Sequence, residues 1–259
     1  MDARCCTIAA DTRSSTDDAD GSMSCVVLTP ARRRGVELLD DPRLDPRDRH
    51  RAQDDIRRSN LWLGGLRAAL AELRAVIAPR DNMVLLDVGT GLADILAEAS
   101  RDVRDAGGSL TTIGVDGALS LLTAARGSTT GMVCADALAL PFRDRSVDVA
   151  MCSQLLHHFT DADIERLLRE LHRVSRRAVI VCDLRRSWFA AAGFWLVSFP
   201  LCFHPITRHD GVVSVLRGFT AGELRRHVNV ATGASPRITR RLGFRLTARW
   251  TRTETASPS

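Results

Sequence analysis

From residue 83 onward, short apolar runs alternate with longer segments in which apolar residues recur every three to four positions. The short runs have the length and composition of buried strands, and they cover 83–88, 110–116, 132–136, 147–153 and 177–184. The longer segments predict amphipathic helices at 92–105, 117–126 and 161–174. Strand and helix in this alternation predict right-handed βαβ units, and therefore a parallel sheet with helices on both faces.

The chain before this region does not show the alternation of strands and helices. Residues 1–24 are polar and acidic, and we expect a disordered tail there. Residues 25–80 predict a helical cap region, because a charged helix with Pro46 near its first turn is followed by a second helix at 66–78. The main domain is then expected over 81–252, and 253–259 is expected to be a flexible tail.

The segment after the fifth predicted strand is irregular. Residues 188–203 are nearly all apolar but contain Gly193, Ser198 and Pro200, and they are too few to span a membrane. A polar loop is predicted at 204–213, and Thr220 with Glu223 forms a capping box that starts another helix. The alternation over 241–252 predicts one or two antiparallel closing strands.

Composition narrows the class of protein. Apolar residues make up 45% of the chain and charged residues 26%, which is typical of a globular protein. No secretory signal is visible, so we expect a cytoplasmic protein. The seven cysteines include no C-x-x-C pair, which argues against a zinc site or a disulfide framework, and Cys134, Cys152 and Cys182 are expected to be buried in strands.

The formal net charge of +5 is unevenly distributed, since residues 161–259 hold 17 Arg against 8 acidic residues. Such a basic region attracts an anionic substrate or a membrane surface. It contains no basic run interleaved with aromatic residues, so we expect no nucleic-acid partner.

A glycine turn lies where the first predicted strand meets the first helix. Glycines there allow positive φ, and the helix N-terminus directs free N–H groups at a ligand. The dinucleotide pattern G-x-G-x-x-G fails, because Asp94 replaces the third glycine and would repel a pyrophosphate. The pattern D/E-x-G-x-G-x-G fits through Asp87, Gly89 and Gly91, with Ala93 as a departure at its last position.

Three further features accompany this turn. Asp116 ends the second predicted strand, Asp136 ends the third, and residues 139–148 (ALPFRDRSVD) lead into the fourth. With the glycine turn, these features make residues 83–185 resemble the class I S-adenosylmethionine-dependent methyltransferases that act on small molecules. The resemblance implies a Rossmann-like, doubly wound, mostly parallel α/β sheet. It also implies a cap over the acceptor, formed by the N-terminal helices and an insertion at about 186–220.

The resemblance further implies S-adenosylmethionine as the methyl donor, S-adenosylhomocysteine as the product, and no metal. Asp116 is expected at the ribose hydroxyls and Asp136 beside the adenine, whereas Asp148 is expected to be structural. The complete set of expected cofactor-binding residues is Asp87, Gly89, Thr90, Gly91, Asp116, Gly117, Asp136, Ala137 and Ser153.

A histidine near the acceptor would assist methylation, because a phenol with a pKa near 10 is mostly protonated at neutral pH. His157 and His158 follow the fourth predicted strand, at the sheet edge where ligands bind. His204 and His209, in the predicted polar loop, are the other candidates for a general base. His172 and His227 fall on predicted helices and are expected at the surface.

These features favour an O-methyltransferase of bacterial secondary metabolism that acts on a hydroxylated aromatic or polyketide-derived molecule. C-methylation of a quinone precursor is the alternative. An RNA or protein methyltransferase, a non-catalytic S-adenosylmethionine-binding protein and an NAD enzyme are further alternatives. The apolar segment 188–203 predicts an apolar or aromatic acceptor and at most peripheral membrane contact. The sequence leaves a homodimer open.

Overall fold

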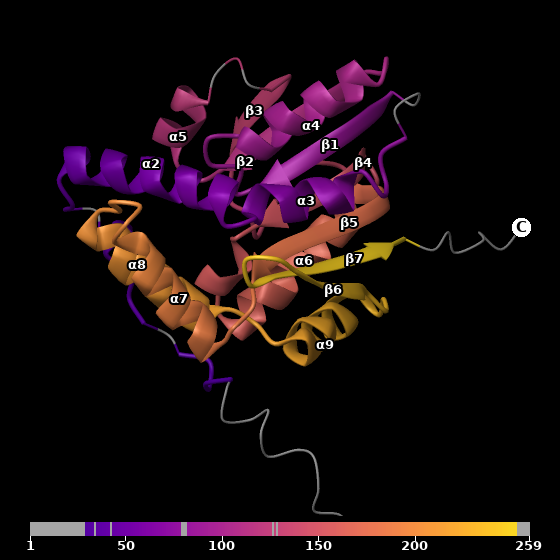
Figure 1. The fold of residues 1–259 in the computed structure, drawn as a ribbon. Helices are drawn as coiled ribbons and strands as arrows, with labels where there is room; N and C mark the ends of the chain where they lie inside the picture. The colour runs from indigo at the N-terminus through magenta and orange to yellow at the C-terminus, as the bar shows by residue number, and fades with distance from the viewer. Residues whose placement is uncertain are drawn as a thin grey trace, which may run out of the picture.

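The computed structural model describes residues 29–252, apart from 34, 42, 79–81, 126 and 128. Its centre is a seven-stranded sheet in the order β3-β2-β1-β4-β5-β7-β6 (Figure 1). The strands are β1 (Met83–Val88), β2 (Leu110–Asp116), β3 (Gly131–Cys134), β4 (Val147–Ser153), β5 (Ser175–Leu184), β6 (Arg237–Arg241) and β7 (Arg245–Thr251). Strands β1 to β5 are parallel, while β7 is antiparallel to both β5 and β6. This sheet confirms the predicted Rossmann-like α/β fold.

The strand register places the carboxyl ends of the central parallel strands side by side. Val88, the last residue of β1, pairs with Val115 of β2 and Cys152 of β4. The carboxyl ends of these strands therefore meet at one edge of the sheet. In open α/β sheets, ligands bind in the crevice beyond this edge.

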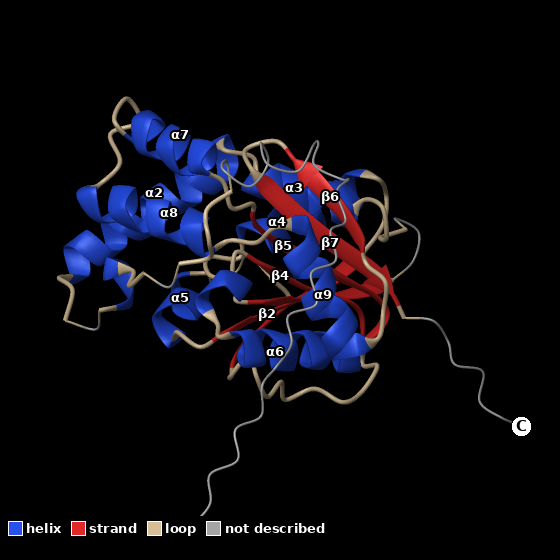
Figure 2. Ribbon diagram, turned by 90° about the horizontal axis from the view of Figure 1, so that it is seen from below, coloured by secondary structure: helices blue, strands red, loops and turns tan. Residues whose placement is uncertain are grey.

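Helices cover both faces of the sheet (Figure 2). On one face, α3 (Gly65–Leu73) and α4 (Asp94–Asp105) bury apolar side chains such as Leu70 and Leu96 against β1, β4 and β5. On the other face, α6 (Asp161–Val174) and α9 (Ala221–Thr232) bury Leu167 and Leu224. A short helix, α5 (Leu119–Ala124), lies against β2 and β3. Both faces of β1, β4 and β5 are thus largely buried, which explains their continuous apolar sequences.

Three helices form a separate layer beyond the carboxyl ends of the parallel strands (Figures 1 and 2). They are α2 (Pro46–Trp62), α7 (Trp188–Ser198) and α8 (Pro205–Arg217), and we call them the cap. Asp55 of α2 ties the cap together, because its Oδ2 accepts hydrogen bonds from His204 N (2.6 Å) and Thr207 Oγ1 (3.2 Å). Two short 3-10 helices lie next to it, η1 (Leu38–Asp40) and η2 (Leu156–His158).

The predicted polar loop at 204–213 is wrong, since most of it belongs to α8. Pro205 is the first helical residue, and the His204 side chain accepts a hydrogen bond from Ile206 N. Proline with its fixed φ and a capped N–H together start a helix that polar composition alone did not predict. The apolar segment 188–203 forms α7 only as far as Ser198.

Other local expectations have mixed outcomes. Cys152 and Cys182 are buried as predicted, but Cys134 is exposed because β3 lies at the sheet edge. His227 is only 1% exposed, against the surface position predicted for it, and packs edge-on against Phe219. His172 is half-buried.

The second N-terminal helix, α3, ends at Leu73 rather than near 78. The expected tails at 1–24 and 253–259 lie outside the described residues. Within the described part of the chain, no helix is long and apolar enough to cross a membrane.

Candidate active site

A cavity of about 730 Å³ lies between the cap and the carboxyl edge of the sheet. It brings together many of the residues that the sequence predicted for the site. These are Asp87, Gly89, Thr90, Gly91, Ser153, His157 and His158. The cap contributes apolar side chains such as Ile56 and Phe194 and polar groups such as Ser214. Cofactor and acceptor candidates therefore line the same cavity.

The glycine turn forms the floor of this cavity beside β1. Gly89 has φ of 73° and Gly91 has φ of 55°, both in the left-handed region that favours glycine. A Cβ on Gly89 would lie 2.9 Å from the Leu155 side chain, whereas a Cβ on Gly91 would point into open space. Gly91 thus leaves room for a ligand to approach the backbone closely. Ala93 adopts a left-handed φ of 60° without being glycine, which shows how the fold accommodates the departure from the pattern.

Asp87 lies under the turn with an unusual environment. Its side chain is buried, Thr90 Oγ1 donates a hydrogen bond to Oδ2 (3.0 Å), and Oδ1 has no partner. Burial raises the pKa of this carboxyl to about 7, against the opposing effect of the Thr90 hydrogen bond. A buried acceptor without a partner is costly, so a donor on a bound ligand, above all a cationic one, would stabilise it.

Asp116 fastens the turn from the end of β2. Its Oδ2 accepts from Gly91 N (3.0 Å) and its Oδ1 from Ala118 N (2.9 Å). Asp136 lies two residues beyond β3 rather than at its end as predicted, because β3 ends at Cys134; its side chain is exposed and accepts from Leu138 N (2.9 Å). Beyond the ends of β2 and β3, and outside the wall of the cavity, lie Asp116, Gly117, Asp136 and Ala137. The predicted cofactor residues therefore fall into two groups: those that line the cavity, and these four residues outside it, which we call the rim.

His157 is held by a buried carboxylate. Its Nδ1 lies 2.7 Å from Asp183 Oδ1, and its backbone N donates to Asp183 Oδ2 (3.2 Å). Burial alone would raise the pKa of Asp183, but the His157 ring and the hydrogen bonds outweigh it and lower the pKa below its ordinary value. Asp183 was missed in the sequence, although an acid at the end of a predicted strand carries the same signal as Asp87 and Asp116.

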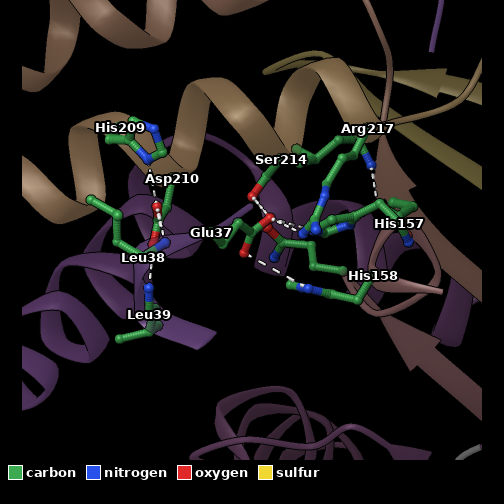
Figure 3. Close-up of polar contacts among 12 residues, drawn as sticks. Glu37, Leu38, Leu39, His157, His158, His209, Asp210, Ser214 and Arg217 are labelled. Atoms are coloured by element: carbon green, nitrogen blue, oxygen red, sulfur yellow. Dashed lines mark hydrogen bonds and ion pairs between the residues drawn. The ribbon is translucent and has the colours of Figure 1, made fainter. Parts of the chain in front are cut away.

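Glu37 stands opposite the two histidines (Figure 3). It accepts hydrogen bonds from Ser214 Oγ (2.8 Å) and Arg217 Nη1 (2.9 Å) of α8. Its carboxylate lies 4.0 Å from His157 Nε2 and 3.7 Å from His158 Nδ1. No local pattern marks Glu37 in the sequence, because its partners lie more than a hundred residues away.

Glu37, His157 and His158 offer ligand atoms that lie within 4.8 Å of one another, a spacing able to hold a metal ion. Arg217 places a positive charge against the same carboxylate, which opposes a cation there. Burial, and then the neighbouring His157, lower the pKa of His158 to about 4. His158 is therefore neutral at pH 7 and can accept a hydrogen bond.

The other two candidate bases lie elsewhere. His204 caps α8, and its Nε2 lies 3.5 Å from Asp48 of α2. The side chain of His209 is 48% exposed and pairs with Asp210 (2.8 Å), whose carboxylate also accepts from Leu38 N and Leu39 N (Figure 3). Neither ring contributes to the wall of the described cavity. The structure thus brings His157 and His158 to the glycine turn and leaves His204 and His209 in the cap.

Comparison with known proteins supports the class of the domain. Residues 86–182 match the family described as "Methyltransferase domain". Demethylmenaquinone methyltransferase from Roseiflexus castenholzii is 36% identical over 106 residues, which are 39% of this chain and 42% of that protein. The protein of the same name from Roseiflexus sp. is 33% identical over 129 residues, 47% of this chain and 52% of that protein. The chain thus matches about half the length of these relatives.

Solved structures share the fold at low identity. Magnesium protoporphyrin IX methyltransferase from Synechocystis PCC 6803, solved with bound S-adenosylmethionine, has a TM-score of 0.52 and 14% identity, over 82% of this chain and 86% of that one. A methyltransferase from Thermotoga maritima has a TM-score of 0.54 and 16% identity, over 79% and 99%. The strand order and the match over 86–182 together indicate the fold of the class I S-adenosylmethionine-dependent methyltransferases. S-adenosylmethionine is the methyl donor of this class.

Proposed function

We propose that the protein transfers a methyl group from S-adenosylmethionine to a ring carbon of a quinone precursor in its reduced, hydroxylated form. The observation that carries the proposal is the cavity that joins the glycine turn to the Asp183–His157 pair. The names of the Roseiflexus relatives favour carbon as the methylated atom over the oxygen of a phenol. The apolar side chains in the cap wall, such as Ile56 and Phe194, suit the hydrocarbon part of such an acceptor.

The residues of the glycine turn fit the methyl donor. Gly91 leaves space for it, and the unpaired Asp87 Oδ1 is a suitable acceptor for a cationic group. We infer that Asp87, Thr90 and Ser153 contact it within the cavity, and that Asp116, Gly117, Asp136 and Ala137 hold its nucleoside from the rim. When bound, it supplies a methyl group on a sulfonium, which is electrophilic without help from a metal.

The histidines prepare the acceptor. His157, positioned by Asp183, takes the proton of a ring hydroxyl, and Asp183 stabilises the imidazolium that results. The phenolate makes the neighbouring ring carbon nucleophilic. Carbon–methyl bond formation accompanies cleavage of the sulfur–methyl bond, after which the ring carbon loses its proton and a ring oxygen regains one. Neutral His158 accepts a hydrogen bond from the acceptor.

The cap excludes water and aligns the two reactants. Ile56 and Phe194 place apolar surface over the polar floor, so the acceptor enters a space with little competing water. A cavity of about 730 Å³ suits a small molecule rather than an RNA or a protein.

The test is product identification. Purified protein is incubated with methyl-labelled S-adenosylmethionine and a set of hydroquinones and phenols, and the labelled product is assigned by NMR. We expect a methyl group on a ring carbon. If the product is a methyl ether instead, the proposed C-methylation is wrong and the protein is an O-methyltransferase that uses the same site. The absence of labelled product from every aromatic acceptor, with S-adenosylmethionine still bound, would overturn the proposed acceptor class.

A further inference from the structure

A buried arginine lies at the functional edge of the sheet and is not used by the chemistry above. Arg245 is the first residue of β7 and pairs with Leu184 at the carboxyl end of β5. It is 4% exposed and contributes to the cavity wall. Because β7 runs antiparallel to the other strands, its beginning lies beside their carboxyl ends.

The charge of Arg245 is poorly compensated within the described residues. Its Nη1 donates to Gln154 Oε1 (2.8 Å), and its Nε is buried without a partner. Asp183 is the carboxylate that most favours its charged form, but Asp183 is occupied by His157 and by Leu184 N (2.7 Å). Burial lowers the pKa of Arg245 to about 10, so it remains protonated at neutral pH. A buried charge with an unpaired donor destabilises the folded chain unless a ligand supplies an acceptor for it.

Gln154 holds the guanidinium in place. It follows β4 with a left-handed φ of 53°, a conformation that costs energy in a residue other than glycine. Its backbone N donates to Cys182 O (2.7 Å), and its side-chain amide donates to Asn60 of α2 while its Oε1 accepts from Arg245. A strained residue fixed at both ends thus sets the orientation of Arg245 beside the cavity.

We propose that Arg245 binds a carboxylate group of a molecule bound in the cavity. The guanidinium offers Nε and Nη donors in the planar arrangement that matches a carboxylate. Resting on the proposed function, the carboxylate comes from one of two sources: the amino-acid part of the methyl donor, or an acid group on the aromatic acceptor.

Calorimetric titration distinguishes the two sources. The first pair of probes is S-adenosylhomocysteine and its decarboxylated analogue, which retains the amino group. The second pair, added with S-adenosylhomocysteine present, is 2,5-dihydroxybenzoate and hydroquinone. Each probe is titrated into wild type and Arg245→Met, with Arg240→Met as a matched control on an exposed arginine of β6.

If the methyl donor supplies the carboxylate, wild type binds S-adenosylhomocysteine at least about 30-fold more tightly than the analogue, and Arg245→Met removes the difference. If the acceptor supplies it, the same discrimination separates the second pair. If Arg245→Met fails to fold, Arg245→Lys is titrated in its place; it keeps the positive charge but not the planar pair of donors, and it should reduce the discrimination. Discrimination that persists in a folded variant would overturn the role of Arg245. Wild type that binds S-adenosylhomocysteine but discriminates within neither pair would overturn the role of Arg245 alone. Wild type that binds none of the probes would overturn the proposed function as well.

Discussion

At the scale of single residues, two buried aspartates have opposite pKa shifts: Asp87 in the cavity wall and Asp183 beside His157. Asp87 has one oxygen without a partner, so burial dominates and raises its pKa to about 7. Asp183 is equally buried, but His157 and backbone N–H groups lower its pKa. The first carboxyl suits a ligand that brings its own positive charge, and the second suits the permanent orientation of a histidine.

Asp87→Asn tests the first role. Because the folded-state pKa lies above the ordinary 3.8, the folded chain binds the extra proton, and stability falls as pH rises from about 4 to about 7. The variant lacks this fall, so at pH 8 its free energy of unfolding without ligand should equal or exceed that of wild type. Its affinity for S-adenosylhomocysteine should drop at least about tenfold. Denaturant unfolding at several pH values and calorimetry measure both, and unchanged affinity would contradict the assignment.

Asp183→Asn and His157→Gln test the second role. Each should lower kcat by about 10²-fold, because His157→Gln removes the base and Asp183→Asn removes the group that orients it. The affinity for S-adenosylhomocysteine should change less than about twofold, since neither residue belongs to the glycine turn. The double variant should be little slower than either single one, as expected for residues that act as a unit. Additive losses, or loss of cofactor binding, would indicate a structural role for the pair.

At the scale of elements, the cap depends on close packing between α7 and α8. A Cβ on Gly211 of α8 would lie 2.0 Å from the Phe194 ring of α7, and both residues contribute to the cavity wall. Local sequence indicated an apolar covering segment but missed α8. Helix α8 starts at Pro205 with His204 as its cap. Its packing requires glycine at position 211, which becomes evident only when α7 packs against it.

Gly211→Ala should therefore displace Phe194 and disturb the acceptor half of the site. We expect KM for the aromatic acceptor to rise about tenfold, with a loss of about 1 to 3 kcal/mol in stability from overpacking. The affinity for S-adenosylhomocysteine should stay the same. Gly222→Ala in α9 is the control, because its Cβ would meet nothing within 4 Å. Equal KM values in the two variants would mean that Phe194 does not contact the acceptor.

At the scale of the whole molecule, the sequence predicted what is local and periodic. The parallel strands and the glycine turn follow from apolar runs and from short spacings between Asp87, Gly89 and Gly91. The long-range polar contacts around the cavity could not be predicted in this way. Glu37 and Arg217 are hydrogen-bonded but 180 positions apart in the sequence, and Gln154 and Arg245 are 91 positions apart. No short-range pattern encodes either pair. These contacts exist only once the sheet and the cap are assembled.

We expect the same arrangement to favour S-adenosylhomocysteine over a dinucleotide. Asp94, where a dinucleotide-binding chain has its third glycine, begins α4 and pairs with Arg57 of the cap at 3.0 Å. A pyrophosphate at this helix end would meet the carboxylate, whereas S-adenosylhomocysteine carries no phosphate. At about 100 times its dissociation constant, S-adenosylhomocysteine should add about 2.7 kcal/mol and raise the unfolding midpoint by several degrees. NAD and NADP, run in parallel in thermal unfolding, should leave the midpoint unchanged. A shift with NAD and none with S-adenosylhomocysteine would mean that the glycine turn is built for a dinucleotide despite Asp94.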